Sequence, residues 1–337
     1  MQGCLVFFMF FLSNLLFSQD LYNLLNNEIK TNLFDKSEQI EGKLILYATD
    51  FNNSVWVNPE KIENIDTLIS LDEDINILLA SISLSLFDSE KFNINSYLTA
   101  LIPGSTEPYL PNSDDYNIPF KQELTAKNLM QQRSGMYDLF GSKFATSNNN
   151  MFLYSDSNFI FIIDSLASYI SKNKLTTIDP NVSFNYNNLN YLILTKILNR
   201  ITETSLISNL EEKISNLTSI KKFRIAEKIS PYLLALFYRN IIKGEKIIPK
   251  RLLDNYLLSP ISINNYYVEY AMGCFYYKKL GYGNINLYNN SVRLSLYIPE
   301  KDIFLLFYII DTKIDKEDFL SSNDIDKLLG LLFKLQI

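Results

Sequence analysis

The chain contains no histidine, two cysteines, and only 10 glycines and 10 prolines in 337 residues. The absence of histidine excludes a Ser-His-Asp triad, a Cys-His pair and every zinc site with a histidine ligand. The sequence also lacks a stripe rich in lysine and arginine, and its net charge is -6. It therefore lacks the electrostatic footprint that binding to a phosphate backbone requires. We expect no nucleic-acid partner, no cofactor and no metal ion.

The N-terminal residues 1–18 form an apolar run of signal-peptide length that ends at the small residue Ser18, before the polar Gln19 and Asp20. This pattern predicts export to the periplasm or the cell exterior. The run carries no lysine or arginine, so an uncleaved anchor is the alternative, although a membrane span needs about 20 apolar residues. Cys4 comes too early in the run to be a lipid-attachment cysteine. No later segment is long and apolar enough to span a bilayer.

Cleavage after residue 18 would leave Cys274 as the only cysteine, so no internal disulfide could form. Cys274 lies in the apolar segment Met272–Tyr276, which predicts a buried, unreactive thiol.

The hydrophobic pattern changes twice along the chain. Residues 42–48 and 54–57 read as two short strands joined by a turn, and an almost all-round apolar helix follows from Asp72 to Asp88. The middle, about residues 90 to 229, is mostly helical, with clear helices at 158–171 and 189–201. After two helical stretches between Pro231 and Asn255, the two-residue hydrophobic alternation that is typical of strands returns. The later predicted elements are strands at 267–278, 291–298 and 303–310, with a helix at 316–335.

Strands at both ends of the chain, with helices between them, predict an α+β fold. We expect an antiparallel sheet flanked by terminal helices, with a mostly helical subdomain inserted. The α/β subdomain would comprise about residues 19–75 and 230–337, and the helical subdomain about residues 76–229.

Four segments carry local patterns that occur in the same order in a known family. Leu124–Met136 resembles LTIRHLLTHTSGL, with Asn128 and Gln132 replacing both histidines. Residues 184–194 resemble F-x-Y-S-N-x-x-Y-x-L-L, residues 230–255 resemble a helix, glycine turn and helix, and residues 297–302 resemble IDPEKD. The chain thus resembles the β-lactamase-related serine hydrolases, which include class C β-lactamases, D-alanyl-D-alanine carboxypeptidases and penicillin-binding proteins. The resemblance covers nearly all of the chain after residue 18 and implies their fold.

In that family a Ser-x-x-Lys motif at the start of the central helix supplies the nucleophile and the lysine that helps to deprotonate it. The lysine is needed one turn later because residues three apart share a helix face. Residues 66–76 match the family segment DTLFRIASVTK without a gap, which places Glu73 at the serine and Asn76 at the lysine. Counting back from Lys91, which matches the lysine of a downstream GKLSL segment, gives the same register. Glutamate cannot supply an alkoxide and asparagine is not a base, so the resemblance implies a lost catalytic centre.

Two further Ser-x-x-Lys strings, Ser171–Lys174 and Ser219–Lys222, lie far from the central helix, and we interpret them as chance occurrences.

The other two family motifs are partly kept. Tyr186 and Asn188 match a Tyr-x-Asn motif, in which the family tyrosine transfers protons and the asparagine holds the substrate amide. A chain this rich in tyrosine and asparagine also produces this motif by accident. The third motif, Lys-Thr-Gly or His-x-Gly on the strand that edges the site, would fall at Tyr282-Gly283-Asn284. A side chain at Asn284 would crowd the substrate, which argues against an oxyanion hole.

Glu73 has two competing interpretations. Ser70 and Glu73 have the spacing of a capping box, and Asp72, Glu73 and Asp74 would complement the helix dipole. Alternatively, Glu73 and Tyr186 face one another and, with Asn188, bind a cationic or hydroxyl-rich ligand. A metal site from three successive acidic residues is disfavoured, because consecutive helix positions point in different directions.

Three functions follow from these residues and the resemblance. The first is a noncatalytic, exported family member that binds a cell-wall peptide, a glycan or a protein in the inherited cleft. The second is an active peptidase, esterase or β-lactamase with an unidentified nucleophile. The third is a structural or interaction module with a vestigial cleft.

Overall fold

The structure is a computed structural model of the whole chain. It describes residues 43–52, 54–57, 69, 71–138, 158–176, 178–202, 206–222, 224, 228–244, 246–263, 265, 268–288 and 291–310. The predicted signal segment 1–18, the predicted helix at 316–335 and the stretch 21–34, whose apolar spacing also predicts a helix, lie outside these residues.

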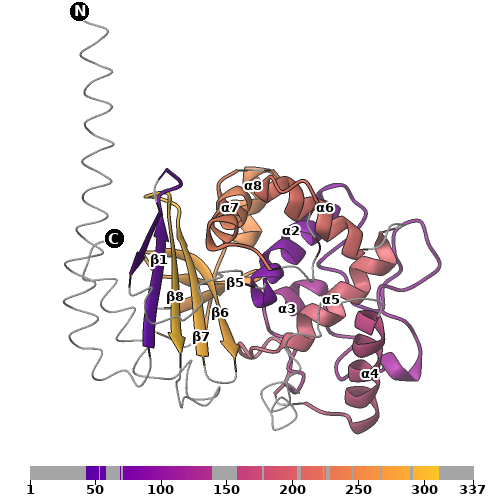
Figure 1. The fold of residues 1–337 in the computed structure, drawn as a ribbon. Coiled ribbons are helices and arrows are strands. Elements are labelled where there is room, and N and C mark those ends of the chain that lie inside the picture. The colour runs from indigo at the N-terminus through magenta and orange to yellow at the C-terminus, as the bar shows by residue number, and fades with distance from the viewer. Residues whose placement is uncertain are drawn as a thin grey trace, which may run out of the picture.

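The described strands form one antiparallel sheet in the order β2-β1-β8-β7-β6-β5-β4-β3. β1 therefore pairs directly with β8, β2 lies outside β1 at the edge, and the long helical region lies between β2 and the later strands in sequence (Figure 1). The strands are β1 Lys43–Thr49, β2 Ser54–Val57, β3 Ile261–Ser262, β4 Val268–Ala271, β5 Cys274–Tyr277, β6 Gly281–Tyr288, β7 Ser291–Ile298 and β8 Ile303–Ile310. This arrangement confirms the predicted α+β fold with a sheet built from distant segments.

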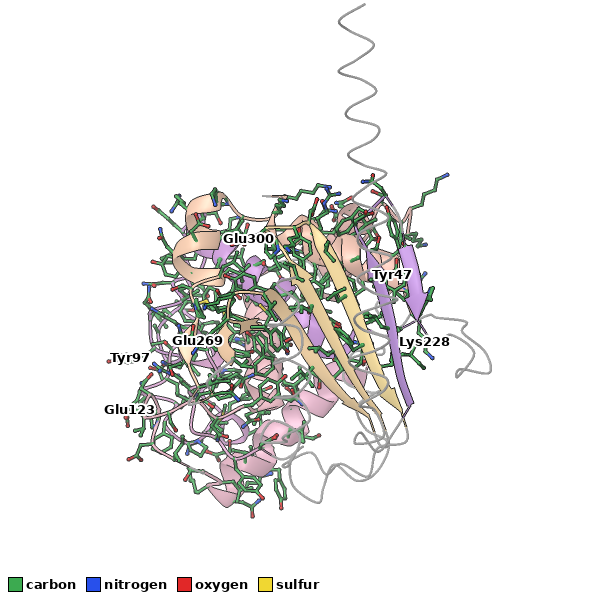
Figure 2. The ribbon with its side chains drawn as sticks, turned by 90° about the vertical axis from the view of Figure 1, so that its left-hand side faces the viewer. Tyr47, Tyr97, Glu123, Lys228, Glu269 and Glu300 are labelled. Atoms are coloured by element: carbon green, nitrogen blue, oxygen red, sulfur yellow. The ribbon has the colours of Figure 1, made fainter. Side chains whose placement is uncertain are left out.

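The apolar sequence of β8 explains why this strand lies inside the sheet. The side chains Phe304, Leu305, Leu306 and Phe307 of β8 are all buried, so both faces of this strand are covered, as its continuous apolar run indicates. Figure 2 shows the sheet in front of the helices, with Tyr47 of β1 at one side and Glu269 of β4 at the other.

The predicted strand 267–278 is in fact a hairpin. β4 ends at Ala271, β5 begins at Cys274, and Gly273 between them has φ +86°. A glycine at this left-handed position reverses the chain without steric cost, which period two alone does not reveal.

The helices are α2 Ile75–Asp88, α3 Ala126–Met130, α4 Asn158–Asn173, α5 Asn188–Ile201, α6 Leu206–Thr218, α7 Pro231–Ile242 and α8 Lys250–Leu252. α8 continues into a π-helical turn, Leu253–Leu257, so the second predicted helix of the 231–255 region is shorter than expected and irregular. α7 contacts β1, β7 and β8, while α2 lies between α5, α7 and the π-helical turn. The central helix is thus buried on all sides: every residue from Ile75 to Leu84 is buried.

Within the described residues, no helix combines the length and the apolar character that crossing a bilayer would require. The predicted boundary between an α/β and a helical subdomain stays a prediction.

Candidate functional site

The head of the central helix is a 3-10 turn, η4, formed by Asp72, Glu73 and Asp74 immediately before α2. Asp72 has φ +41°, an uncommon conformation for a residue other than glycine, and such strain often occurs at functional positions. The three acidic side chains differ in environment, because Asp74 is fully buried while Asp72 and Glu73 are half-buried.

Within the described residues, helix capping explains little of why three acidic side chains gather at this helix head. Asp74 is the N-cap of α2, yet its side chain accepts no capping hydrogen bond. Ser70 lies outside the described residues, so the capping box with Glu73 stays a prediction.

Asp74 instead anchors the helix to the sheet. Its carboxylate accepts hydrogen bonds from Arg293 Nη2 at 2.6 Å, from Asn286 Nδ2 at 3.1 Å and from the Ser295 hydroxyl at 3.4 Å. The Tyr238 hydroxyl of α7 also donates to it. Such a carboxylate is stable in the interior because an arginine and several donors surround it.

Burial raises the pKa of the Asp74 carboxyl above its ordinary value, although Arg293 and the Tyr238 hydroxyl favour its ionised form. Burial and the neighbouring carboxylate likewise raise the pKa of Tyr238. Arg293 is 1% exposed and also lies 3.9 Å from Asp72, so one buried arginine balances two of the three acidic groups.

Two asparagines of β6 hold the backbone of Glu73. The Glu73 N–H donates to Asn286 Oδ1 at 2.9 Å, and the Glu73 carbonyl oxygen accepts from Asn284 Nδ2 at 3.1 Å. Asn284 Nδ2 also donates to the carbonyl oxygen of Gly273 at 3.0 Å. Both asparagines are buried. The structure therefore brings Glu73 and Asn284 together and adds Asn286.

Asn76 is buried against the β4–β5 hairpin. A Cβ at Gly273 would lie 2.5 Å from the carbonyl oxygen of Asn76 and 2.6 Å from Cα of Ile77, so only glycine allows this approach. Asn76 is 3% exposed.

The Tyr-x-Asn segment packs on the same hairpin. The ring of Tyr186 stacks on Phe275, with centroids 5.8 Å apart and planes at 20°, and meets Tyr270 edge to face at 6.2 Å. Phe184 packs on Tyr270 at 5.1 Å. The β4–β5 hairpin thus contacts Asn76 through its turn and Tyr186 through its strands.

Gln132, at the position of a family histidine, fixes the loop that carries Tyr186. Its backbone carbonyl accepts from the Asn185 N–H at 2.8 Å, and its side-chain Oε1 accepts from the Asn187 N–H at 2.9 Å. Asn187 is the N-cap of α5, which begins at the half-buried Asn188. A buried amide therefore holds the backbone on both sides of Tyr186.

Other predicted positions lie elsewhere. The Tyr282 hydroxyl donates to the carbonyl oxygen of Leu258 at 3.2 Å, and its ring packs on Tyr276 at 4.9 Å. Tyr282 therefore contacts Leu258, directly after the π-helical turn, and Tyr276 of β5.

The two further Ser-x-x-Lys strings lie at the ends of α4 and α6. The Ser171 hydroxyl donates to the carbonyl oxygen of Asp115 at 3.0 Å, while Lys174 Nζ donates to that of Asn117 at 3.4 Å. Ser219 has φ +62° just after the end of α6, and Lys222 is exposed.

Cys274 is a buried free cysteine, as predicted, and burial raises the pKa of its thiol, which keeps the sulfur protonated at neutral pH. Among the described residues, no group of three or more acidic or cysteine side chains is placed to hold a metal ion.

Sequence reasoning missed Asp74, Arg293 and Asn286 as members of this site. One signal was available: Arg293 interrupts a predicted strand whose neighbours are apolar, and a buried arginine requires an acidic partner. The identity of that partner depends on the sheet register.

The chain is similar to known proteins in sequence family and in fold. The Beta-lactamase family model matches residues 66–229. No curated protein sequence matches the chain. The D-amino acid amidase from Ochrobactrum anthropi SV3, complexed with L-phenylalanine amide, superposes with a TM-score of 0.64 at 12% identity, covering 93% of this chain and 100% of the amidase.

Two further solved structures show the same fold. The octameric penicillin-binding protein homologue from Pyrococcus abyssi has a TM-score of 0.60 at 14% identity, over 90% of this chain and 77% of that one. The β-lactamase/D-alanine carboxypeptidase from Pseudomonas syringae has a TM-score of 0.59 at 10% identity, over 92% and 98% of the two chains.

Proposed function

We propose that this chain, which is a β-lactamase-related protein of the serine hydrolase family, is a noncatalytic member that binds a ligand at the head of α2. The observation that carries the proposal is Glu73, whose half-buried side chain stands one residue after the strained Asp72 at the start of the central helix. A carboxylate there offers no hydroxyl for acyl transfer, and Asn76 one turn later offers no amine.

Charge and aromatic surface indicate the class of ligand. The helix head carries three carboxyl groups, and those of Asp72 and Asp74 lie 3.9 and 2.6 Å from Arg293. Half-buried Phe184 and Tyr186 add ring faces on the β4–β5 hairpin. Carboxylates together with ring faces favour a cation, and carboxylates also accept hydrogen bonds from hydroxyls. A peptide with an amino group, or an amino sugar of a cell-wall glycan, has this chemistry.

A catalytic assay tests the loss of chemistry. The purified protein is incubated with a fluorescent penicillin, a chromogenic cephalosporin and L-phenylalanine amide. We expect neither a covalent adduct nor turnover. Labelling or hydrolysis that Tyr186→Phe abolishes would contradict the proposal and support the alternative of an active hydrolase.

A thermal-shift titration tests ligand binding. L-phenylalanine amide and cell-wall muropeptides serve as probes, because a ligand at about 100 times its dissociation constant adds about 2.7 kcal/mol of stability. We expect Glu73→Gln, which removes the charge and keeps the shape, to abolish the shift. Glu123→Gln, at an exposed position labelled in Figure 2, is the matched control. A shift that survives Glu73→Gln would instead favour a structural or interaction module with its working surface elsewhere.

We also propose that the protein is exported and loses residues 1–18. Mass spectrometry of the protein from the periplasmic and extracellular fractions tests this directly. A mature chain that begins at residue 19 supports export, and an intact N-terminus at Met1 in the membrane fraction supports the uncleaved anchor.

A further inference from the structure

We infer that Asn286 is a specificity-determining residue, which closes the Glu73 backbone amide to any ligand oxygen and leaves the Glu73 carboxylate as the recognition group. The inference rests on the proposed function, because it concerns the same helix head. It adds a second reason for the lack of acyl transfer, independent of the lost serine.

In acyl transfer on serine, backbone N–H groups, among them that of the nucleophile residue, stabilise the oxyanion. Here the corresponding N–H, that of Glu73, donates to Asn286 Oδ1 at 2.9 Å. A carboxamide oxygen of the protein therefore occupies the direction in which a substrate carbonyl oxygen would bind.

The ion pair of Asp74 and Arg293 holds the Asn286 carboxamide in one orientation. Asn286 Nδ2 donates to Asp74 Oδ2 at 3.1 Å, and the same oxygen accepts from Arg293 Nη2 at 2.6 Å. A flipped carboxamide would place its oxygen against the Asp74 carboxylate and its NH2 against the Glu73 N–H. Both contacts would be repulsive, so the ion pair fixes which end of Asn286 faces the amide.

The side chain of Asn286 has no room to adopt another conformation. Its side chain is 0% exposed, β6 pairs with β7 on one side through Asn286 and Arg293, and Asn284 ties the Glu73 carbonyl to the same strand. Displacing Asn286 would leave buried polar groups without partners, which is costly. A ligand that needs the amide is thereby excluded, whereas a cation needs only the carboxylate.

The test uses variants that restore the family residues. We compare Glu73→Ser/Asn76→Lys with the triple variant that adds Asn286→Gly. In either protein, acylation by fluorescent penicillin would form the bond from serine Oγ to the lactam carbon. It would break the lactam C–N bond and pass the hydroxyl proton through the introduced amine to the lactam nitrogen. We expect the triple variant to be labelled about 10² to 10³ times faster, the usual effect of one oxyanion donor.

The matched control adds Asn95→Gly, at an exposed site, to the double variant, and we expect it to label like the double variant. Equal labelling of the double and triple variants, or no labelling of a triple variant that circular dichroism shows to be folded, would overturn the inference about Asn286. Labelling of the wild-type protein would instead overturn the proposed loss of catalysis.

A second measurement needs no restored site. Amide hydrogen exchange of the wild-type protein, followed at the Glu73 N–H, reports its hydrogen bond directly. We expect strong protection that falls at least tenfold in Asn286→Ser, while the amide of Leu98, bonded to the Leu124 carbonyl at 2.8 Å, is unchanged. Fast exchange of the Glu73 amide in the wild-type protein would refute the inference even if the triple variant fails to fold.

Discussion

Two clusters, each of one aspartate, one arginine and one tyrosine, connect α7 to the sheet. In one cluster α7 supplies the tyrosine and the sheet supplies the arginine, and in the other cluster these two roles are exchanged. In the buried cluster, Asp74 receives a hydrogen bond from Tyr238 of α7 and pairs with Arg293 of β7.

In the half-buried cluster, at the β7–β8 turn, Asp302 pairs with Arg239 of α7 and accepts a hydrogen bond from Tyr297 of β7 at 2.6 Å. The composition is the same, but the helix now supplies the arginine and the strand supplies the tyrosine. Lys243 adds a second cation 3.7 Å from Asp302.

Burial separates the two clusters. The side chains of Asp74 and Arg293 are 0% and 1% exposed, whereas those of Asp302 and Arg239 are 26% and 39% exposed. Burial raises the pKa of Asp74. It acts in the same direction on Asp302, but there the hydrogen bonds from Tyr297 and Arg239 outweigh it and lower the pKa. The same residue types thus have opposite pKa shifts, because desolvation competes with pairing and wins only in the interior.

Replacing the arginine of each cluster should give the largest difference in stability between the two clusters. Arg293→Met keeps the volume but leaves Asp74 as a buried acid without its cation, and we expect a loss of about 3 to 5 kcal/mol in the free energy of unfolding. Arg239→Met, in the half-buried cluster, should cost about 1 kcal/mol or less. Urea denaturation of both variants measures the difference, and equal losses would show that burial does not govern these clusters.

A double variant tests whether the buried pair stabilises the fold or only avoids an unpaired charge. We expect Asp74→Leu/Arg293→Met to recover at least about 1 kcal/mol relative to Arg293→Met, because replacing a whole buried ion pair is far less costly than breaking it. The free energies of unfolding of wild-type, single and double variants complete the cycle. A double variant less stable than the single variant would contradict this expectation.

The tyrosines provide a smaller test. Tyr238→Phe removes a donor from a buried carboxylate and should destabilise the protein by about 1.5 to 3 kcal/mol. Tyr297 is itself buried, but the Asp302 carboxylate that it donates to is 26% exposed and keeps Arg239 as a partner, so Tyr297→Phe should cost about 1 kcal/mol or less. Thermal unfolding of the two variants at equal protein concentration compares them, and a larger loss from Tyr297→Phe would reverse the ranking.

The smallest effects are opposite pH dependences. The raised pKa of Asp74 means that the folded state binds more protons there, so its contribution makes the free energy of unfolding fall as pH rises above the ordinary carboxyl pKa. The lowered pKa of Asp302 gives a contribution that is present above the ordinary pKa and is lost as pH falls through the folded-state value. We therefore expect Asp74→Asn and Asp302→Asn to change the slope of unfolding free energy against pH in opposite directions, measured by urea titrations from about pH 3 to about pH 7. Slope changes of the same sign would refute the assignment.

Local patterns predicted some elements closely. Strands β7 and β8 have the bounds predicted for residues 291–298 and 303–310, because the hydrophobic pattern that marks a strand is short-range. The hairpin of β4 and β5 was predicted wrongly as one strand, since only the φ of Gly273 distinguishes a turn there from an extended glycine.

The sequence by itself determined the two-ended strand pattern, the buried central helix and the identity of Glu73 and Asn76 at its head, because hydrophobic period and motif spacing are properties of neighbouring residues. Only the tertiary structure decided that Asn286 and Arg293, more than 200 residues later in the chain, meet Glu73 and Asp74. Those contacts depend on the order and register of strands β6 and β7 against the helix. A one-residue slip would turn both side chains to the other face of the sheet, and no short stretch of sequence specifies that choice alone.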